Sequence, residues 1–194
     1  MSLEKQLWML VGGNGAGKST FYELFLKDLG LPFVNADNLA KIAYPEDPEG
    51  RSRDAAKLAE GMRKNLLLSG QSFCFETVYS HPSKIDFVAE AKAQGYYVVV
   101  VMIHLNSTDL NQARVAERVS VGGHTVAADK IVSRVPRMLK HVRMSIPLCD
   151  LITVYDNSSQ DDPYQQVFTI ENGKTTKHLD PLPDWAERLL QPVD

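Results

Sequence analysis

The sequence predicts an α/β fold, in which a mostly parallel sheet of five strands has helices on both faces. Short apolar runs that suit buried strands alternate along the chain with longer segments whose apolar residues recur at helical spacing. The first of these runs leads through a glycine-rich turn into a helical segment. Such an alternation is typical of parallel sheets, in which each helix crosses over from one strand to the next.

Length and composition indicate a single globular domain that spans residues 1–194. The chain has 44% hydrophobic and 23% charged residues, and its formal net charge of −3 argues against a nucleic-acid partner. Cys74 and Cys149 lack metal-ligand spacing, which favours small buried residues and a cytoplasmic location. No apolar run is long enough to serve as a signal peptide or to cross a membrane, so no membrane partner is expected.

The glycine-rich turn, residues 12–20, reads GGNGAGKST and follows an apolar strand predicted over residues 7–11. The spacing Gly12-x-x-x-x-Gly17-Lys18-Ser19 is typical of a phosphate-binding loop at the start of a helix. Lys18 is expected to reach the outer phosphates of a nucleoside triphosphate, and Ser19 is expected to bind Mg²⁺. The alternative is a turn that only connects strand and helix. The motif favours the nucleotide site, and with it the three-layer fold of phosphate-loop NTPases.

We expect the whole loop to bind the nucleotide. Its residues are Gly12, Gly13, Asn14, Gly15, Ala16, Gly17, Lys18, Ser19 and Thr20.

The second predicted strand, residues 32–35, ends just before Asp37. Gly30 suits a left-handed helix cap and Pro32 prevents continuation, so the first helix ends there. Ligands of open parallel sheets bind outside the carboxyl ends of the strands, which makes Asp37 a candidate site residue. The alternative is that Asp37 caps the next helical turn.

A helix predicted over residues 51–68 leads into a third strand, residues 72–75, which is followed by Glu76 and Thr77. A carboxylate at this position suits a metal-bound water or an acceptor hydroxyl. The alternative for Glu76 is a solvated strand end.

The longest apolar run, residues 96–105, predicts a central parallel strand and follows a helix predicted over residues 82–94. His104 lies near its end. It could reach the site, although a lone histidine at a strand end more often has a structural hydrogen bond.

Residues 111–145 contain seven lysines or arginines but only two acidic residues. Two basic helices with a glycine-rich break at residues 121–125 predict a lid that closes over phosphates and excludes water. Arg118 and Arg134 are the lid arginines that we expect at the transferring phosphoryl group. The alternative is a solvated charged face.

The C-terminal segment, residues 164–190, predicts a small hairpin and a last helix. A fifth strand over residues 151–155 precedes it, and Asn172-Gly173 is a strong hairpin signal between two β-rich runs. The final helix is expected over residues 183–190.

Two large classes of phosphate-loop protein do not suit the sequence. Residues 68–71, Leu-Ser-Gly-Gln, imitate part of the signature of transporter ATPases, but they end a helix instead of beginning one. No Asn-Lys-x-Asp sequence is present to read guanine, which argues against a GTPase.

The ordered set of motifs resembles the zeta toxin family of phosphate-loop kinases, in particular its shorter bacterial branch. The matching residues are the loop 12–20, Asn35-Ala36-Asp37, Phe75-Glu76-Thr77, the lid residues Arg114, Arg118, Gly122, Gly123, His124, Arg134 and Arg137, and Asp156-Asn157-Ser158.

The resemblance implies an ATP-dependent kinase with Mg²⁺ that phosphorylates a hydroxyl group of a small molecule, with UDP-N-acetylglucosamine as a candidate acceptor. It implies that Asp37 is the general base and that Arg118, Arg134 and Asn157 bind the nucleotide. It also implies an antitoxin protein as a candidate partner.

Glu76 is expected to bind the metal. The residues expected to bind the acceptor are Glu76, Asp37, Thr77 and Arg137. The chain departs from the family over residues 77–80, where the family carries a sequence like Gly-Thr-Gly-Arg, and this puts the acceptor in question. Two alternatives to a small-molecule kinase are an ATP-binding switch or ATPase without an acceptor, and a kinase that acts on polynucleotide ends.

Overall fold

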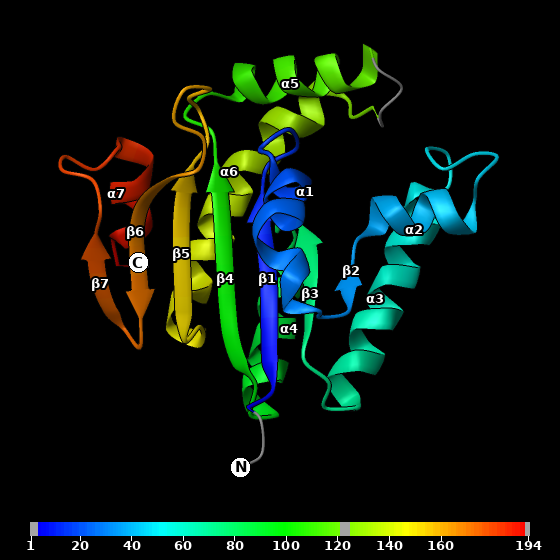
Figure 1. The fold of residues 1–194 in the computed structure, drawn as a ribbon, viewed down its shortest axis with the longest axis horizontal. Coiled ribbons are helices and arrows are strands. Elements are labelled where there is room, and N and C mark those ends of the chain that lie inside the picture. Colours follow the sequence, from blue (N-terminus) through cyan, green and yellow to red (C-terminus); the bar gives the residue numbers. More distant parts are fainter. Residues whose placement is uncertain (1–3, 121–124, 193–194) are drawn as a thin grey trace.

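The computed structural model describes residues 4–120 and 125–192 of the chain. Seven strands of these residues form one sheet with the order β2-β3-β1-β4-β5-β6-β7 (Figure 1). The strands are β1 (Gln6–Gly12), β2 (Phe33–Val34), β3 (Phe73–Thr77), β4 (Tyr97–His104), β5 (Leu151–Asp156), β6 (Gln165–Glu171) and β7 (Lys174–Lys177).

The first five strands are parallel, as predicted, and the hairpin β6–β7 extends the same sheet. The predicted C-terminal hairpin thus adds two strands to the five predicted parallel ones, and the sheet has seven strands in the described residues. Strand β6 pairs antiparallel with β5 and so covers backbone groups that an edge strand would expose. At the turn, φ is 49° for Asn172 and 78° for Gly173, as a tight two-residue hairpin requires.

The helices follow the predicted segments, with one addition. They are α1 (Lys18–Phe21), α2 (Ala36–Ala43), α3 (Ser52–Leu68), α4 (Ser83–Ala93), α5 (Thr108–Ser120), α6 (Ala128–Ser145) and α7 (Asp184–Leu190). Helix α1 continues through a π-helical segment, Tyr22–Leu26, and a 3₁₀ turn, Lys27–Leu29, which ends at Gly30 with φ of 64°. A second 3₁₀ turn, Ile146–Leu148, follows α6. Helix α2 is the addition, at a place where only a helical turn was considered.

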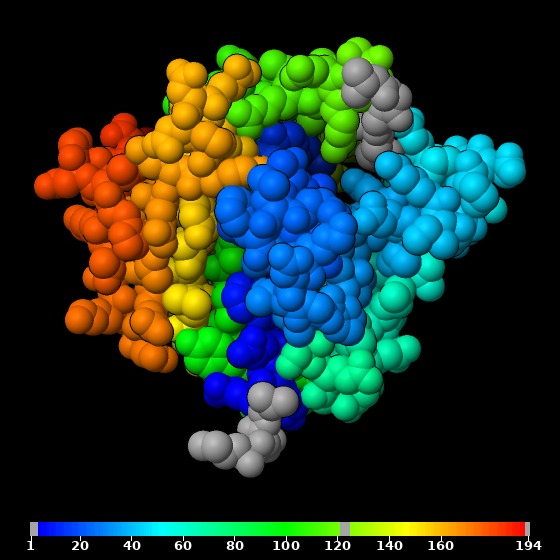
Figure 2. All heavy atoms as spheres, in the orientation of Figure 1, coloured from blue at the N-terminus to red at the C-terminus, as the bar shows by residue number. Residues whose placement is uncertain are grey.

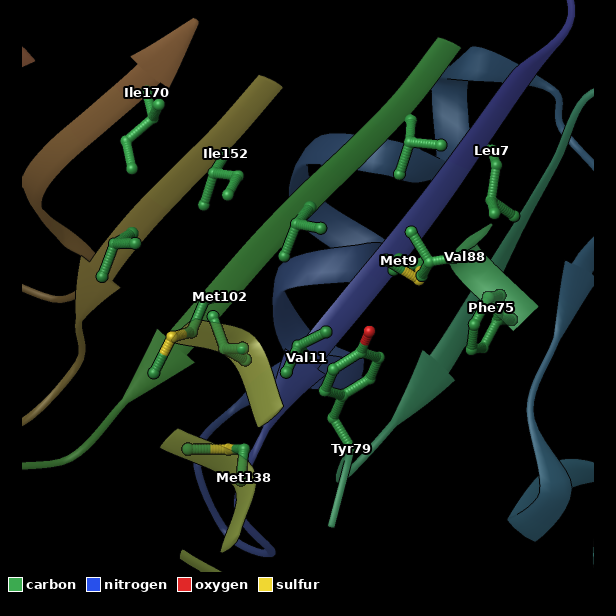
Figure 3. Packing of buried hydrophobic residues seen from close by; sticks show 14 of the residues in the cluster. Leu7, Met9, Val11, Phe75, Tyr79, Val88, Met102, Met138, Ile152 and Ile170 are labelled. Carbon is green, nitrogen blue, oxygen red and sulfur yellow. The ribbon is translucent and has the colours of Figure 1, made fainter. Parts of the chain in front are cut away.

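The sheet is buried on both faces, which confirms the three-layer fold. Figure 1 shows α1 in front of the sheet and α4 and α6 behind it. On the rear face, Leu7, Met9 and Val11 of β1 share a core with Val88 of α4 and Met138 of α6 (Figure 3). On the front face, the intervening strand residues form a second core with α1. Burial on both faces explains why the strands read as continuous apolar runs.

The carboxyl ends of the parallel strands face α5, which crosses above them in Figure 1. Helices α2 and α3 pack on one another beyond β2, at the edge of the sheet. The loop after β1, the end of β3, α2 and the two lid helices therefore meet at one end of the molecule. None of the helices in the described ranges is long and apolar enough to cross a membrane.

The break between the two lid helices falls largely on residues 121–124, which lie outside the described residues. Helix α6 continues past Pro136 without interruption.

Candidate functional site

The phosphate-binding loop connects β1 to α1 and has two positions that require glycine. At Gly15 and Gly17, φ is 75° and 96°, in the left-handed region that favours glycine. A Cβ at Gly17 would lie 2.5 Å from Asn157 Nδ2, and a Cβ at Gly15 would lie 2.7 Å from the backbone oxygen of Asn111. The loop is thus enclosed by neighbouring elements as well as turned tightly.

Lys18 and Ser19, at the start of α1, both contact Glu76 at the end of β3. Lys18 Nζ donates to the backbone oxygen of Gly13 at 3.0 Å and lies 3.4 Å from Glu76 Oε1. Ser19 Oγ donates to Glu76 Oε2 at 3.1 Å. Asn35 Nδ2 donates to the same carboxylate oxygen at 2.7 Å. Glu76 therefore connects the loop to the start of α2.

The oxygen atoms of Ser19 and Glu76 suit Mg²⁺. Mg²⁺ is commonly held by one or two protein oxygens together with substrate phosphates and water. Ser19 Oγ and Glu76 Oε2 are 3.1 Å apart beside the phosphate loop, so both can turn toward one ion. Within the described ranges, no group of three or more His, Cys, Asp or Glu side chains forms a metal site of its own. The donor set fits a metal that arrives with the nucleotide.

Asp37 lies in the first turn of α2 and does not cap that helix. The cap is Asn35, whose Oδ1 accepts a hydrogen bond from the backbone nitrogen of Asn38 at 3.0 Å. The alternative that Asp37 is the cap is therefore wrong. The Asp37 side chain is exposed and makes no hydrogen bond or ion pair with any described residue, so its carboxylate is available to a ligand.

A cleft of about 1330 Å³ contains most of the predicted site residues. Figure 2 shows the surface hollowed between α1 in blue and α2 in cyan, below α5 in green. The predicted residues that line the cleft are Asn14, Gly15, Gly17, Lys18, Ser19, Thr20, Asp37, Glu76, Thr77, Arg118, Arg134 and Asn157.

Four predicted site residues are not part of the cleft lining. Gly12, Gly13 and Ala16 are the buried residues of the loop that do not reach the cleft surface. Arg137 is exposed on α6, where Nε donates to the backbone oxygen of Ser133 at 2.9 Å. The structure therefore does not bring Arg137 together with the other predicted acceptor residues.

Both lid helices contact Asn14 of the loop. Arg134, on α6, donates through a terminal nitrogen to Asn14 Oδ1 at 3.3 Å. Asn111 of α5 donates from Nδ2 to the Asn14 backbone oxygen at 2.7 Å and is only 1% exposed. Asn111 could not be selected from the sequence, because an asparagine in the first turns of a polar helix is ordinary.

Asn157 and Tyr164 hold the loop from the side of β5. Asn157 Nδ2 donates to the Ala16 oxygen at 2.9 Å, and the Tyr164 hydroxyl donates to the Gly17 oxygen at 2.9 Å. Asn157 is buried, so this bond positions the loop backbone. Tyr164 was not predicted, since its contact depends on a residue far away in the sequence.

The segment after Glu76 is held against α6 through Tyr79, a residue with positive φ of 60°. The Tyr79 hydroxyl shares a hydrogen bond of 2.7 Å with Ser145, and its carbonyl oxygen lies 3.0 Å from His141 Nδ1. Burial raises the pKa of the Tyr79 hydroxyl, so it stays protonated. This segment is where the sequence departs from the zeta toxin pattern, and its backbone is fixed by the lid helix.

His104 is not part of the cleft. Its ring packs 4.4 Å from the ring of Trp185 in α7. Burial lowers the pKa of His104 to about 4, although the nearby Asp156 carboxylate partly opposes the shift. This histidine therefore has a structural role, through the packing of its ring against Trp185.

Comparisons with known proteins identify the family of the chain. The zeta toxin family model matches residues 2–166. An uncharacterized protein of Haemophilus influenzae is 31% identical over 139 residues, which cover 68% of this chain and 99% of that protein.

Solved structures share the fold at lower identity. AvrRxo1-ORF1:AvrRxo1-ORF2 with sulphate ions has a TM-score of 0.75 and 17% identity, and the match covers 100% of this chain and 67% of that chain. The same complex with ATP matches with a TM-score of 0.67 at 16% identity, over 91% of this chain and 61% of that one. The PezAT toxin-antitoxin system of Streptococcus pneumoniae has a TM-score of 0.66 and 17% identity, over 97% of this chain and 84% of that chain.

The family match extends from the first predicted strand through the phosphate loop, the lid and Asn157. The chain therefore belongs to the zeta toxin family.

Proposed function

We propose that this protein is an ATP-dependent kinase that transfers the γ-phosphate of ATP to a hydroxyl group of a small molecule. The observation that carries the proposal is that one cleft contains the phosphate loop with Lys18, the Ser19–Glu76 oxygen pair and an available carboxylate, Asp37. Membership of the zeta toxin family supports an ATP-dependent kinase. A structure of similar fold that holds ATP adds support.

In this proposal the loop and Lys18 bind the triphosphate. Backbone N–H groups of the loop and the start of α1 present partial positive charge to the phosphates. Lys18 can turn from the Gly13 oxygen and Glu76 toward the outer phosphates. Ser19 and Glu76 would hold Mg²⁺, which neutralises phosphate charge when bound.

Asp37 is proposed as the base because its carboxylate is available, whereas Glu76 is engaged. Glu76 already contacts Lys18, Ser19 and Asn35. As the acceptor oxygen forms its bond to the γ-phosphorus, the bond from that phosphorus to the bridging oxygen of ADP breaks. Asp37 accepts the hydroxyl proton during this step. Glu76 and Thr77 would orient the metal or the acceptor.

Arg118 and Arg134 are proposed to neutralise charge on the phosphoryl group as it transfers. Both line the cleft, from α5 and α6 respectively. A planar guanidinium matches the equatorial phosphoryl oxygens in geometry as well as charge. Closure of the two helices over the loop would also exclude water, which would otherwise hydrolyse ATP.

The family resemblance makes a nucleotide sugar such as UDP-N-acetylglucosamine the first acceptor to test. The similar PezAT structure is of a toxin-antitoxin system, which supports a search for an antitoxin that binds this chain. A kinase for polynucleotide ends would instead lose oligonucleotide affinity steeply as salt is added. An ATPase without an acceptor would release phosphate to water alone.

Replacement of Lys18 tests the proposal. Lys18→Ala should abolish ATP binding measured by calorimetry, because it removes the point charge from the phosphate site. Lys18 is 6% exposed, so a thermal melt must establish that the variant is folded.

The matched control is Lys27→Ala, which removes a lysine that pairs with Glu23 on the outer surface of the same helical segment. It should bind ATP as the parent protein does. Equal ATP affinity in folded Lys18→Ala and parent protein would refute the nucleotide site.

A further inference from the structure

One wall of the cleft carries an excess of positive charge. Neither ATP binding at the phosphate loop nor proton transfer to Asp37 requires these cations. The residues of α3 that line it recur every three or four positions, as one face of a helix does. They include Arg53, Lys57, Glu60 and Arg63. Lys84, in α4, lines the same cleft.

Arg63 is the most buried cation of this wall, with 7% exposure. Its guanidinium lies over the ring of Phe75, 5.0 Å from the centroid. Burial lowers the pKa of Arg63, and the charge of Glu60 only partly opposes this shift. Within the described ranges, no carboxylate lies within ion-pair distance of Arg63. The side chain is thus largely removed from water and stacked in a fixed place, with no ion pair to compensate.

Lys84 is a second cation of this wall, and it is half-buried. Burial is the main cause that lowers the pKa of its ammonium group, and the positive charge of Arg63 lowers it further. Glu60 opposes the shift, but it forms no ion pair with Lys84 in the described part of the chain. Two cations that repel each other in a partly dehydrated wall destabilise the free protein unless an anion binds between them.

We propose that Arg63 and Lys84 bind a phosphate group carried by the acceptor, so that the substrate class is phosphorylated hydroxyl compounds. The inference rests on the proposed kinase activity. Lys18 and the phosphate loop belong to the ATP site, whereas Arg63 lies on α3 over Phe75 of β3, and Lys84 lies in the first turn of α4. The two anion sites are therefore built from different elements of one cleft.

The two side chains suit this group. A guanidinium fixed against Phe75 presents parallel N–H donors to two phosphate oxygens, and an ammonium adds a compact charge. A phosphate bound there would orient the acceptor relative to Asp37, which lies on α2, packed against α3. The nearby residues 77–80 differ from the sequence that the family carries at this place. Recognition of the acceptor by residues of α3 and α4 is consistent with this difference.

The first experiment uses inorganic phosphate as the probe and does not need the acceptor. The protein is saturated with a non-hydrolysable ATP analogue, which occupies the phosphate loop, and phosphate is then titrated by calorimetry. The parent protein should bind phosphate, and Arg63→Gln and Lys84→Gln should each bind it roughly tenfold more weakly or worse, as loss of charged hydrogen bonds implies. Affinity for the ATP analogue should be unchanged in both variants.

Lys64→Gln is the matched control, since Lys64 neighbours Arg63 on α3 but does not line the cleft. It changes the net charge equally and should bind phosphate as the parent does. Thermal melts establish that each variant is folded, and Arg63→Lys, which retains the charge, gives a second test at this position. Absence of phosphate binding in the parent protein, or equal binding in parent and Arg63→Gln, would overturn the proposal.

The second experiment distinguishes the source of the phosphate group. Transfer of labelled phosphate from ATP is compared for N-acetylglucosamine, its 1-phosphate and its UDP derivative, which share every sugar hydroxyl except the one at C1. Phosphorylation of the 1-phosphate or of the UDP derivative supports the proposal if it depends on Arg63. The compound that reacts also identifies the bound group as a phosphate monoester or a diphosphate. Preference for the uncharged sugar contradicts it.

If the ATP analogue itself fails to bind, the kinase proposal fails. Phosphate titration of the Lys18→Ala protein, without nucleotide, then still decides whether Arg63 and Lys84 form an anion site.

Discussion

Asp37 is available to a ligand, whereas Glu76, the carboxylate that contacts Lys18 and Ser19 of the phosphate loop, is engaged. Replacement by asparagine keeps its size and hydrogen-bonding reach but removes the proton acceptor. Asp37→Asn should therefore bind ATP with the parental affinity and transfer phosphate about 10²-fold more slowly or worse. Calorimetry with ATP and transfer of labelled phosphate to the acceptor measure the two effects separately.

Asp86→Asn is a suitable control, because Asp86 is exposed on α4 and does not line the cleft. It should leave both measurements unchanged. Parental transfer rates in Asp37→Asn would contradict the assignment, and Glu76 would then become the leading candidate for the base.

The residues that could be predicted from the sequence are those whose chemistry requires a particular type at a particular spacing. Gly17, Lys18 and Ser19 belong to this group, because a phosphate loop specifies them locally. Asn111 and Tyr164 could not be predicted. Each donates to a loop carbonyl from a distant element, and such partners are defined only after the chain has folded.

Arg118 of α5 gives a prediction for the lid. If its guanidinium spans oxygens of the transferring phosphoryl group, a lysine at this position supplies charge without the planar geometry. Arg118→Lys should then lose transfer nearly as severely as Arg118→Ala, by about 10³-fold. Single-turnover transfer assays at saturating ATP measure this loss.

Lys140→Ala removes a cation of α6 that is exposed and lies outside the cleft, and it should retain activity. Full activity in Arg118→Lys would mean that Arg118 contributes only diffuse positive charge.

Most elements of the fold could be predicted because their signals are local and strong. The apolar strands, Gly30 as a helix end and the Asn172-Gly173 turn are examples. Helix α2 was missed because it has only eight residues and is enclosed between a strand of two residues, Phe33–Val34, and a polar turn. The π-helical segment Tyr22–Leu26 was missed because an apolar stretch of five residues fits several helical geometries.

Pairing of the hairpin with β5 illustrates what is determined by the whole molecule. The turn signal predicts that β6 and β7 pair with each other, but it carries no information about the next strand. Long-range pairing depends on which edge remains open after the parallel strands assemble. The continuous sheet is consistent with a single domain over residues 1–194, which stays a prediction. Coincident unfolding followed by circular dichroism and by Trp fluorescence would test it.

His104 links the packing of β4 and α7 to pH. The pKa of His104 is lowered from 6.5 to about 4, chiefly by burial, so the folded protein holds the ring neutral where the unfolded chain binds a proton. The stabilising effect of the neutral ring is complete above pH 6.5. It decreases as pH falls toward 4, by about 3 kcal/mol in total, and it then levels off.

Replacement of His104 should therefore make the free energy of unfolding less dependent on pH. Between pH 7 and 4.5, the free energy of unfolding should decrease more for the parent protein than for His104→Gln. Other groups that titrate in this range contribute to the decrease in both proteins. His178→Gln, which removes an exposed histidine of the hairpin region, should retain the parental slope. Denaturant unfolding at a series of pH values measures the slopes, and an NMR titration of the His104 ring gives the pKa directly. Parallel stability curves for parent and His104→Gln, or a ring that titrates at the ordinary pKa of histidine, would contradict this account of β4 and α7 packing.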